Sequence, residues 1–144
     1  MPILNVKVSA PRSEELTRKI VTLLLSLTSK ILKKDPSLTS IAIDYVHPQD
    51  WYIAGMSLHE INKTSIYFDI RITDETNTKD EKALYIHKAF EGFSKLFSNL
   101  HEESYIHIFD VRADAYGYGG FTQEWRYHHS QQPKEKHQER LTFT

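Results

Sequence analysis

Residues 2–8 read Pro-Ile-Leu-Asn-Val-Lys-Val, and their alternation of apolar and polar side chains decides the first element of the fold. The apolar residues at every second position share one face with Pro2, whereas Asn5 and Lys7 point to the other face. A period of two is typical of a half-buried β-strand. The pattern therefore predicts a strand over 3–8 that begins almost at the chain terminus.

The chain that follows repeats one order of elements twice. Apolar residues recur at helical spacing in two long segments, each of which separates two runs rich in β-branched and aromatic residues. Each second run leads into a hairpin segment that ends in glycine. The expected elements are a helix over 14–34, a strand over 40–46, a hairpin over 47–55, a strand over 66–73, a helix over 78–99, a strand over 105–112 and a hairpin over 116–120.

This recurrence predicts a duplicated α+β domain over 1–127, made of two β-α-β repeats at about 2–60 and 65–125. Two such units side by side give a four-stranded sheet with both helices on one face. The strands carry apolar residues on both faces, so the uncovered face predicts association with other subunits. The segment 128–144 is polar without apolar periodicity and is expected to form a tail.

Composition excludes several classes of function. The 144 residues include no cysteine, which excludes disulfides and thiolate catalysis. The formal charge of −1 offers no general attraction for nucleic acid. No apolar run is long enough to cross a membrane, and the amino terminus lacks a secretory signal pattern, so a cytoplasmic location is expected.

Four short motifs occur in order along the chain: Pro2-Ile3, Arg12-Ser13-Glu14-Glu15, Leu38-Thr39-Ser40 and Trp51 to Gly55. This ordered set resembles the tautomerase superfamily. The first sixty residues are similar to 4-oxalocrotonate tautomerase, and the duplicated length is similar to the cis-3-chloroacrylic acid dehalogenase branch. The resemblance implies a tautomerase/MIF-like fold, assembled as a trimer with an active site at each amino-terminal proline.

The resemblance makes Pro2 the expected catalytic base once Met1 is removed. A terminal proline is a secondary amine, and an α-amino group normally titrates near ~8. Apolar walls or a nearby cation lower the pKa of such an amine, because they disfavour its charged form. A neutral amine can then move a proton between carbon and oxygen of a small acid.

Three other residues are substrate-binding candidates by the same resemblance. Arg12 would grip the substrate carboxylate, since a planar guanidinium binds both oxygens. Trp51 would form an apolar wall, although a packed core tryptophan is an equal alternative. Tyr118 would donate a hydrogen bond, with Tyr116 as the neighbouring alternative.

The sequence also departs from the family pattern. Ala42 stands where 4-oxalocrotonate tautomerase has a second-strand arginine, and His107 stands at the duplicate position. Arg71, on the third predicted strand, and Arg112, at the end of the fourth, are possible replacement cations. The sequence leaves open which of the three replaces it.

Two further positions bear on the reaction type. The dehalogenase branch has paired arginines after its third strand, where this chain has Thr73 and either Thr76 or Asn77. Glu124 is the nearest match to that branch's water-activating glutamate. Loss of the paired arginines favours plain tautomerisation over hydration or dehalogenation.

The sequence therefore predicts a cofactor-independent tautomerase or isomerase acting on a small 2-oxo or 2-hydroxy-dienoic acid. A hydratase or dehalogenase of a small unsaturated acid and a non-catalytic oligomeric binding protein are the alternatives. No metal site is expected, because the eight histidines lack ligand spacing. The expected partners are a small carboxylate substrate and further copies of the chain.

Overall fold

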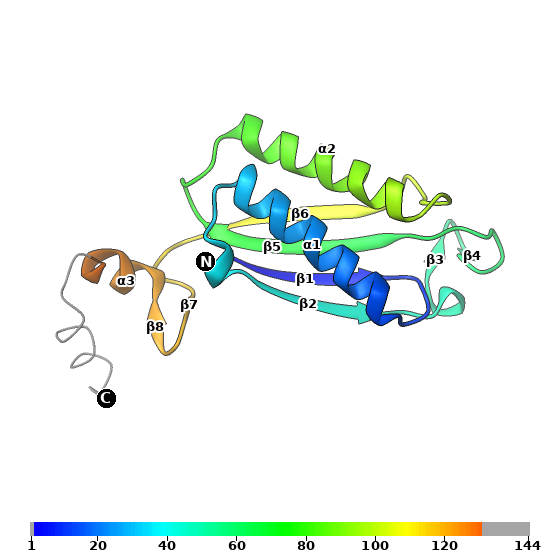
Figure 1. Ribbon diagram of the computed structural model, residues 1–144, viewed down its shortest axis with the longest axis horizontal. Coiled ribbons are helices and arrows are strands. Elements are labelled where there is room, and N and C mark those ends of the chain that lie inside the picture. The colour runs from blue at the N-terminus through cyan, green and yellow to red at the C-terminus, as the bar shows by residue number, and fades with distance from the viewer. Residues whose placement is uncertain (1, 131–144) are drawn as a thin grey trace.

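The protein folds around one mixed four-stranded sheet that two long helices cover (Figure 1). The computed structural model describes residues 2–130. The sheet has the order β2-β1-β5-β6. The strands of the sheet and the two long helices are, in chain order, β1 (Ile3–Val8), α1 (Glu14–Lys30), β2 (Ser40–Tyr45), β5 (Ile66–Thr73), α2 (Lys79–Leu96) and β6 (Tyr105–Val111).

Shorter elements follow the second strand of each repeat, apart from η1, which precedes β2. Each repeat has a two-stranded hairpin, β3-β4 in the first and β7-β8 in the second. A short helix, α3, closes the described chain. These elements are η1 (Pro36–Leu38), η2 (Pro48–Asp50), β3 (Tyr52–Ile53), β4 (Met56–Ser57), β7 (Gly117–Tyr118), β8 (Phe121–Thr122) and α3 (Gln123–His129).

The two β-α-β repeats run in opposite directions. Within each repeat the strands are parallel, so that Ile3 pairs with Ser40 and Tyr67 pairs with Tyr105. Between the repeats β1 and β5 are antiparallel, with Ile3 opposite Arg71. The carboxyl ends of β5 and β6 therefore lie at the same end of the sheet as the start of β1.

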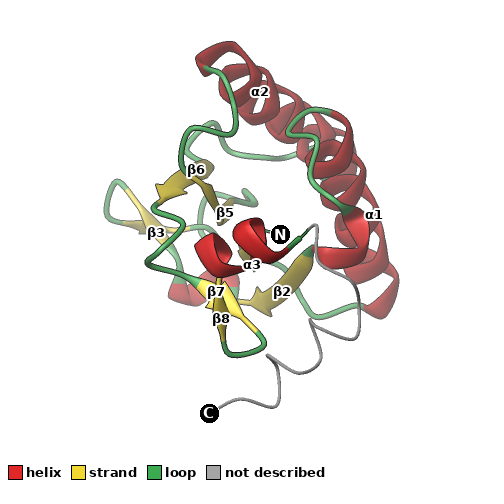
Figure 2. Cartoon of the chain, turned by 90° about the vertical axis from the view of Figure 1, so that its left-hand side faces the viewer, coloured by secondary structure: helices red, strands yellow, loops and turns green. Residues whose placement is uncertain are grey.

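Both helices pack on one face of the sheet, as the edge-on view shows (Figure 2). Alternate residues of β1 and β5 are buried beneath them, and Phe68 of β5 packs against Tyr85 and Phe93 of α2. The opposite face has no helix among residues 2–130. The predicted α+β class, four-stranded sheet and one-sided helices are confirmed.

The strands β1 and β5 have the predicted limits, but the first helix is shorter than predicted. α1 ends at Lys30 rather than at Lys34. Lys33 takes a left-handed backbone conformation with φ of 59°, and the amide of Lys34 donates to the carbonyl of Thr28 at 3.2 Å. Such a left-handed residue ends a helix by turning the chain back on its last carbonyls.

The helix α3 was not predicted. Its Thr122 N-cap accepts a hydrogen bond from Trp125, but the helix is too short to show apolar periodicity. His128 and His129, the first residues of the predicted tail, belong to α3. Residues 131–144 of that tail lie outside the described residues.

Among the described helices, none has the length and apolar character needed to cross a bilayer.

The Tyr85→Phe variant should lose about 1–3 kcal/mol of unfolding free energy. Tyr85 is fully buried, and its hydroxyl shares a 2.8 Å hydrogen bond with Thr28, whose hydroxyl would lose its partner. Urea denaturation at neutral pH measures this difference. The exposed Tyr127 provides a matched control, since Tyr127→Phe should leave stability unchanged.

The same residue predicts a pH dependence of stability. Burial raises the pKa of Tyr85 above its ordinary 10.0. Above that pH the unfolded chain ionises this phenol while the folded chain holds it neutral, so wild-type stability should fall as the pH rises. The stability of the Tyr85→Phe variant should fall less steeply over that pH range. Equal slopes for the two proteins would show that Tyr85 does not cause the pH dependence.

Candidate active site

Pro2 lies at the middle of one end of the sheet. It is buried, and its carbonyl oxygen accepts a hydrogen bond from the backbone nitrogen of Ser40 at 3.1 Å. The next residue, Ile3, lies opposite Arg71, so the end of β5 adjoins Pro2 on its other side. Burial disfavours the charged form of an amine, and this position therefore suits a neutral base.

Four other predicted site residues lie at this same end. Arg71 is close to the end of β5, and Arg112 follows β6 directly. Tyr118 belongs to β7 and Glu124 to α3. Both are part of residues 113–130, termed the C-terminal arm, which extends beyond the sheet beside the amino terminus (Figure 1).

Arg12 and Trp51 lie at the opposite end of the sheet. Both follow strands that run away from Pro2, and the six residues of β1 span about 20 Å. Arg12 lines a cavity of about 360 Å³ together with Tyr45 and His47. Trp51 lines another, of about 630 Å³, on the uncovered face. A single chain therefore does not bring these two residues to Pro2.

Arg71 and Arg112, the two predicted cations at the Pro2 end, are both engaged with carboxylates. Arg71 donates to Asp69 at 2.7 Å, and its guanidinium lies over the ring of Phe109 at 4.7 Å. Because Asp69 precedes Arg71 on β5, this contact draws the guanidinium back from the strand end. Arg112 is largely exposed and donates to Asp114 at 3.3 Å.

The two tyrosines of the second hairpin have different surroundings. The Tyr118 ring stacks under the guanidinium of Arg126 at 3.8 Å. The Tyr116 hydroxyl instead shares a 2.8 Å hydrogen bond with Thr73 at the end of β5, and burial raises the pKa of Tyr116. Tyr116, the alternative left open by the sequence, is thus the tyrosine that contacts the strand next to Pro2.

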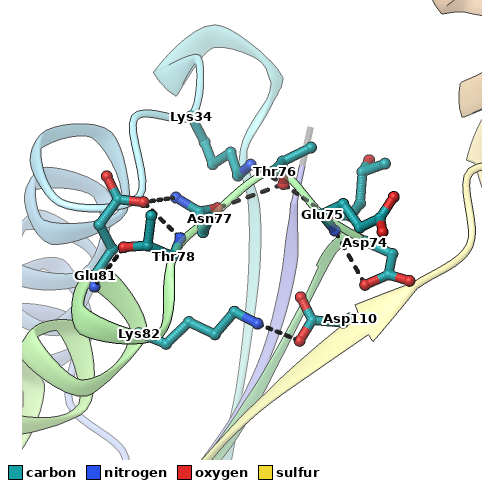
Figure 3. A network of polar contacts seen from close by, with 10 residues as sticks. Lys34, Asp74, Glu75, Thr76, Asn77, Thr78, Glu81, Lys82 and Asp110 are labelled. Atoms are coloured by element: carbon teal, nitrogen blue, oxygen red, sulfur yellow. Dashed lines mark hydrogen bonds and ion pairs between the residues drawn. The ribbon is translucent and has the colours of Figure 1, made fainter.

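Sequence reasoning did not single out Lys34, which lies in a polar network after α1 (Figure 3). The Lys34 ammonium donates to the Thr76 hydroxyl at 2.8 Å. Asn77 donates to the carbonyl of Leu32 at 3.0 Å, so the loop after β5 is fastened to the end of α1. Burial lowers the pKa of Lys34, opposed by the charges of Glu81 and Asp110.

The remaining positions that depart from the family pattern lie away from the sheet ends. Ala42 is in the middle of β2, opposite Asn5. His107 is in the middle of β6, where it pairs with Asp69 and stacks on Phe109 with ring centroids 3.8 Å apart. Within residues 2–130, no cluster of three or more acidic or histidine side chains is placed to bind a metal ion.

Comparison with known proteins gives one sequence match and several structural ones. Residues 2–61 match the family model described as Tautomerase enzyme. No curated protein matches the chain. The chain resembles Pt0534 inactivated by 2-oxo-3-pentynoate, with a TM-score of 0.74 and 11% identity over 85% of this chain and 98% of that chain.

Two further solved structures have the same architecture. An asymmetric trimer of F6 fused 4-OT has a TM-score of 0.74 and 14% identity, over 85% of this chain and 97% of that one. The macrophage migration inhibitory factor-like protein of Entamoeba histolytica has a TM-score of 0.66 and 14% identity, over 81% and 94%. At these identities the structural likeness establishes the fold. Together with the match over the first repeat, it confirms the predicted resemblance to the tautomerase superfamily in its fused, duplicated layout.

Proposed function

We propose that this protein is a cofactor-independent tautomerase or isomerase in which the amine of Pro2 is the general base. The observation that carries the proposal is the position of Pro2, buried at the end of the central strands and followed immediately by β1. Burial at this place disfavours the charged form of an amine, so the neutral amine is available as a base at neutral pH. The proposal requires that Met1 be removed.

The proposed substrate is a small 2-oxo or 2-hydroxy-dienoic acid. Pro2 takes a proton from the enol hydroxyl or from carbon next to the carbonyl and returns one at carbon, with no net redox change. Cations at the same end stabilise the negative charge that develops. The structurally similar Pt0534 is inactivated by 2-oxo-3-pentynoate, which is an unsaturated 2-oxo acid. This likeness supports the same chemical class for the present chain.

We further propose that the active form is a homo-oligomer, with a trimer as the expected state. Pro2 lies at one end of the sheet and Arg12 and Trp51 at the other, so head-to-tail packing would bring the two ends together from different chains. The uncovered sheet face has exposed side chains that a neighbour would bury, among them Ile3 and Tyr105. Fused 4-OT relatives of similar fold are trimers.

Untagged protein should convert phenylenolpyruvate to its keto form, followed as the loss of enol absorbance. The assay is run on fractions separated by size with their masses measured by light scattering. Activity should appear in the fraction with the mass of three chains, because a lone chain lacks Arg12 and Trp51 beside Pro2. Absence of turnover in fractions whose intact mass shows free Pro2 would refute the proposed reaction.

A further inference from the structure

A cavity of about 480 Å³, termed the far-end cavity, lies at the end of the sheet opposite Pro2. It is lined by Leu16 in the first turn of α1, by Phe97 at the end of α2 and by residues within the segment 58–64, which follows β4. The start of α1, the end of α2 and the β3-β4 hairpin all lie at this end of the molecule (Figure 1). The volume is in the range of small-molecule binding sites.

The far-end cavity is separate from the residues assigned to the proposed reaction. It adjoins the cavity of Arg12 at Ala10 and Pro11, but the two cavities share no other lining residue. Trp51 lines neither of them. The far-end cavity therefore offers a binding place that the chemistry at Pro2 does not use.

The floor of the far-end cavity is apolar. Leu58 is fully buried there, although it does not belong to the main core beneath the helices. Leu16, Pro48 and Phe97 also line the cavity and are half-buried. A ligand with an apolar body would cover these side chains and remove their remaining surface from water, which is favourable.

The rim of the far-end cavity has basic side chains and no carboxylate. Lys63 and His59 line the cavity and are exposed, and within residues 2–130 neither side chain has an acidic partner. The acidic residue between them, Glu60, accepts hydrogen bonds from the amide and hydroxyl of Ser57 at 3.3 and 3.0 Å. The ammonium and an imidazole N–H are thus available as donors to an anion.

Backbone contacts fix the rim in place. The Thr64 amide donates to the Asn99 carbonyl at 3.1 Å, and the His101 amide donates to the Thr64 carbonyl at 2.7 Å. The Asn99 side chain donates to the carbonyl of Asn62 at 3.2 Å, where the backbone is left-handed with φ of 51°. A ligand would meet a largely preformed site, so little of its binding free energy would be spent on ordering the loop.

We propose that the far-end cavity binds a small amphipathic anion, a carboxylate with an aromatic or branched apolar body. Lys63 and His59 hold the carboxylate at the rim, and Leu58 and Phe97 contact the apolar body on the floor. The apolar floor and the absence of acidic lining residues together select this class over cations and over small, fully polar anions. This inference does not depend on the proposed reaction.

The test titrates 2-naphthoate into the full chain and follows the fluorescence of the ligand. Saturable binding is expected, and the uncharged 2-naphthalenemethanol should bind at least about tenfold more weakly. Lys63→Met should weaken 2-naphthoate binding about three- to tenfold, and Lys63→Arg should restore most of it. The matched control Lys79→Met removes another exposed lysine, at the opposite end of α2, and should leave the dissociation constant unchanged.

Amide chemical shifts locate the bound ligand. On addition of 2-naphthoate the changes should centre on residues 58–64 and 97–99 and should spare Ser40, whose amide lies at the Pro2 end. Saturating phenylpyruvate, a probe for the Pro2 site, should not displace the ligand. Shift changes that centre on Ser40, displacement by phenylpyruvate, or equal affinity in wild type and Lys63→Met would each overturn the proposal.

Discussion

Protein that retains Met1 should be about 10²- to 10⁴-fold slower with phenylenolpyruvate than protein that begins at Pro2. Retention of Met1 converts the Pro2 nitrogen into a tertiary amide, which has no basic lone pair, while every side chain of the site stays in place. Methionine retention is obtained by blocking the processing enzyme during expression and is verified by intact mass. Treatment of the same sample with purified methionine aminopeptidase should restore the rate, which excludes misfolding as the cause.

Pro2→Ala makes the complementary change. The processed variant begins with a primary amine instead of a secondary one and lacks the ring that fixes the nitrogen, so a loss of at least about tenfold is expected. In the wild type the rate should fall as acid protonates the amine. Equal rates for Met1-retaining and processed protein would remove Pro2 from the mechanism.

Phe68→Ala should lower the unfolding free energy by about 3–5 kcal/mol. Phe68 is fully buried in β5, and its ring lies 6.3 Å from that of Tyr85 and 6.1 Å from that of Phe93. Truncation removes the apolar contacts between the sheet and α2 and leaves a cavity that the rigid sheet cannot collapse to fill. The midpoint of urea denaturation measures the change.

Leu84→Ala is the matched control for this prediction. Leu84 is on the same helix but is 46% exposed, and alanine is an excellent helix former. Its substitution should change stability by no more than about 0.5 kcal/mol. A loss for Phe68→Ala no larger than that of the control would show that the contact between β5 and α2 is not the centre of the core.

Strands were easier to predict from the sequence than helix ends. The alternation in β1 and the apolar run of β5 gave their limits correctly, because strand periodicity is read directly from neighbouring residues. The end of α1 depends on the backbone of Lys33, a residue type with no preference for the left-handed conformation it adopts. α3 has only seven residues, too few to show apolar periodicity, although its Thr122 cap and the stacking of Phe121 on Trp125 are local contacts.

The candidate site could be predicted only in part, for a geometric reason. Motif order identified Pro2, Arg12 and Trp51, but order along a chain does not say which end of a sheet a residue reaches. The parallel pairing of β1 and β2 decides that question for Arg12 and Trp51, which follow the far ends of these two strands. The antiparallel junction of β1 and β5 instead brings Arg71 to the end where Pro2 lies. The contact between Lys34 and Thr76 had no signal in the sequence, because it depends on the loop after β5 folding against the end of α1.

The opposed repeats also limit how many reactive nitrogens the molecule can have. The start of β5 is the counterpart of the start of β1, but a continuous peptide enters it, and the Ser65 nitrogen there is an amide that donates to the Ser9 hydroxyl at 2.8 Å. An assembly of fused chains therefore has half as many terminal amines as an assembly of the same size built from separate repeats. The counterpart end has no terminal amine of its own, so under the proposed function Arg12 and Trp51, which lie there, serve the Pro2 of another chain.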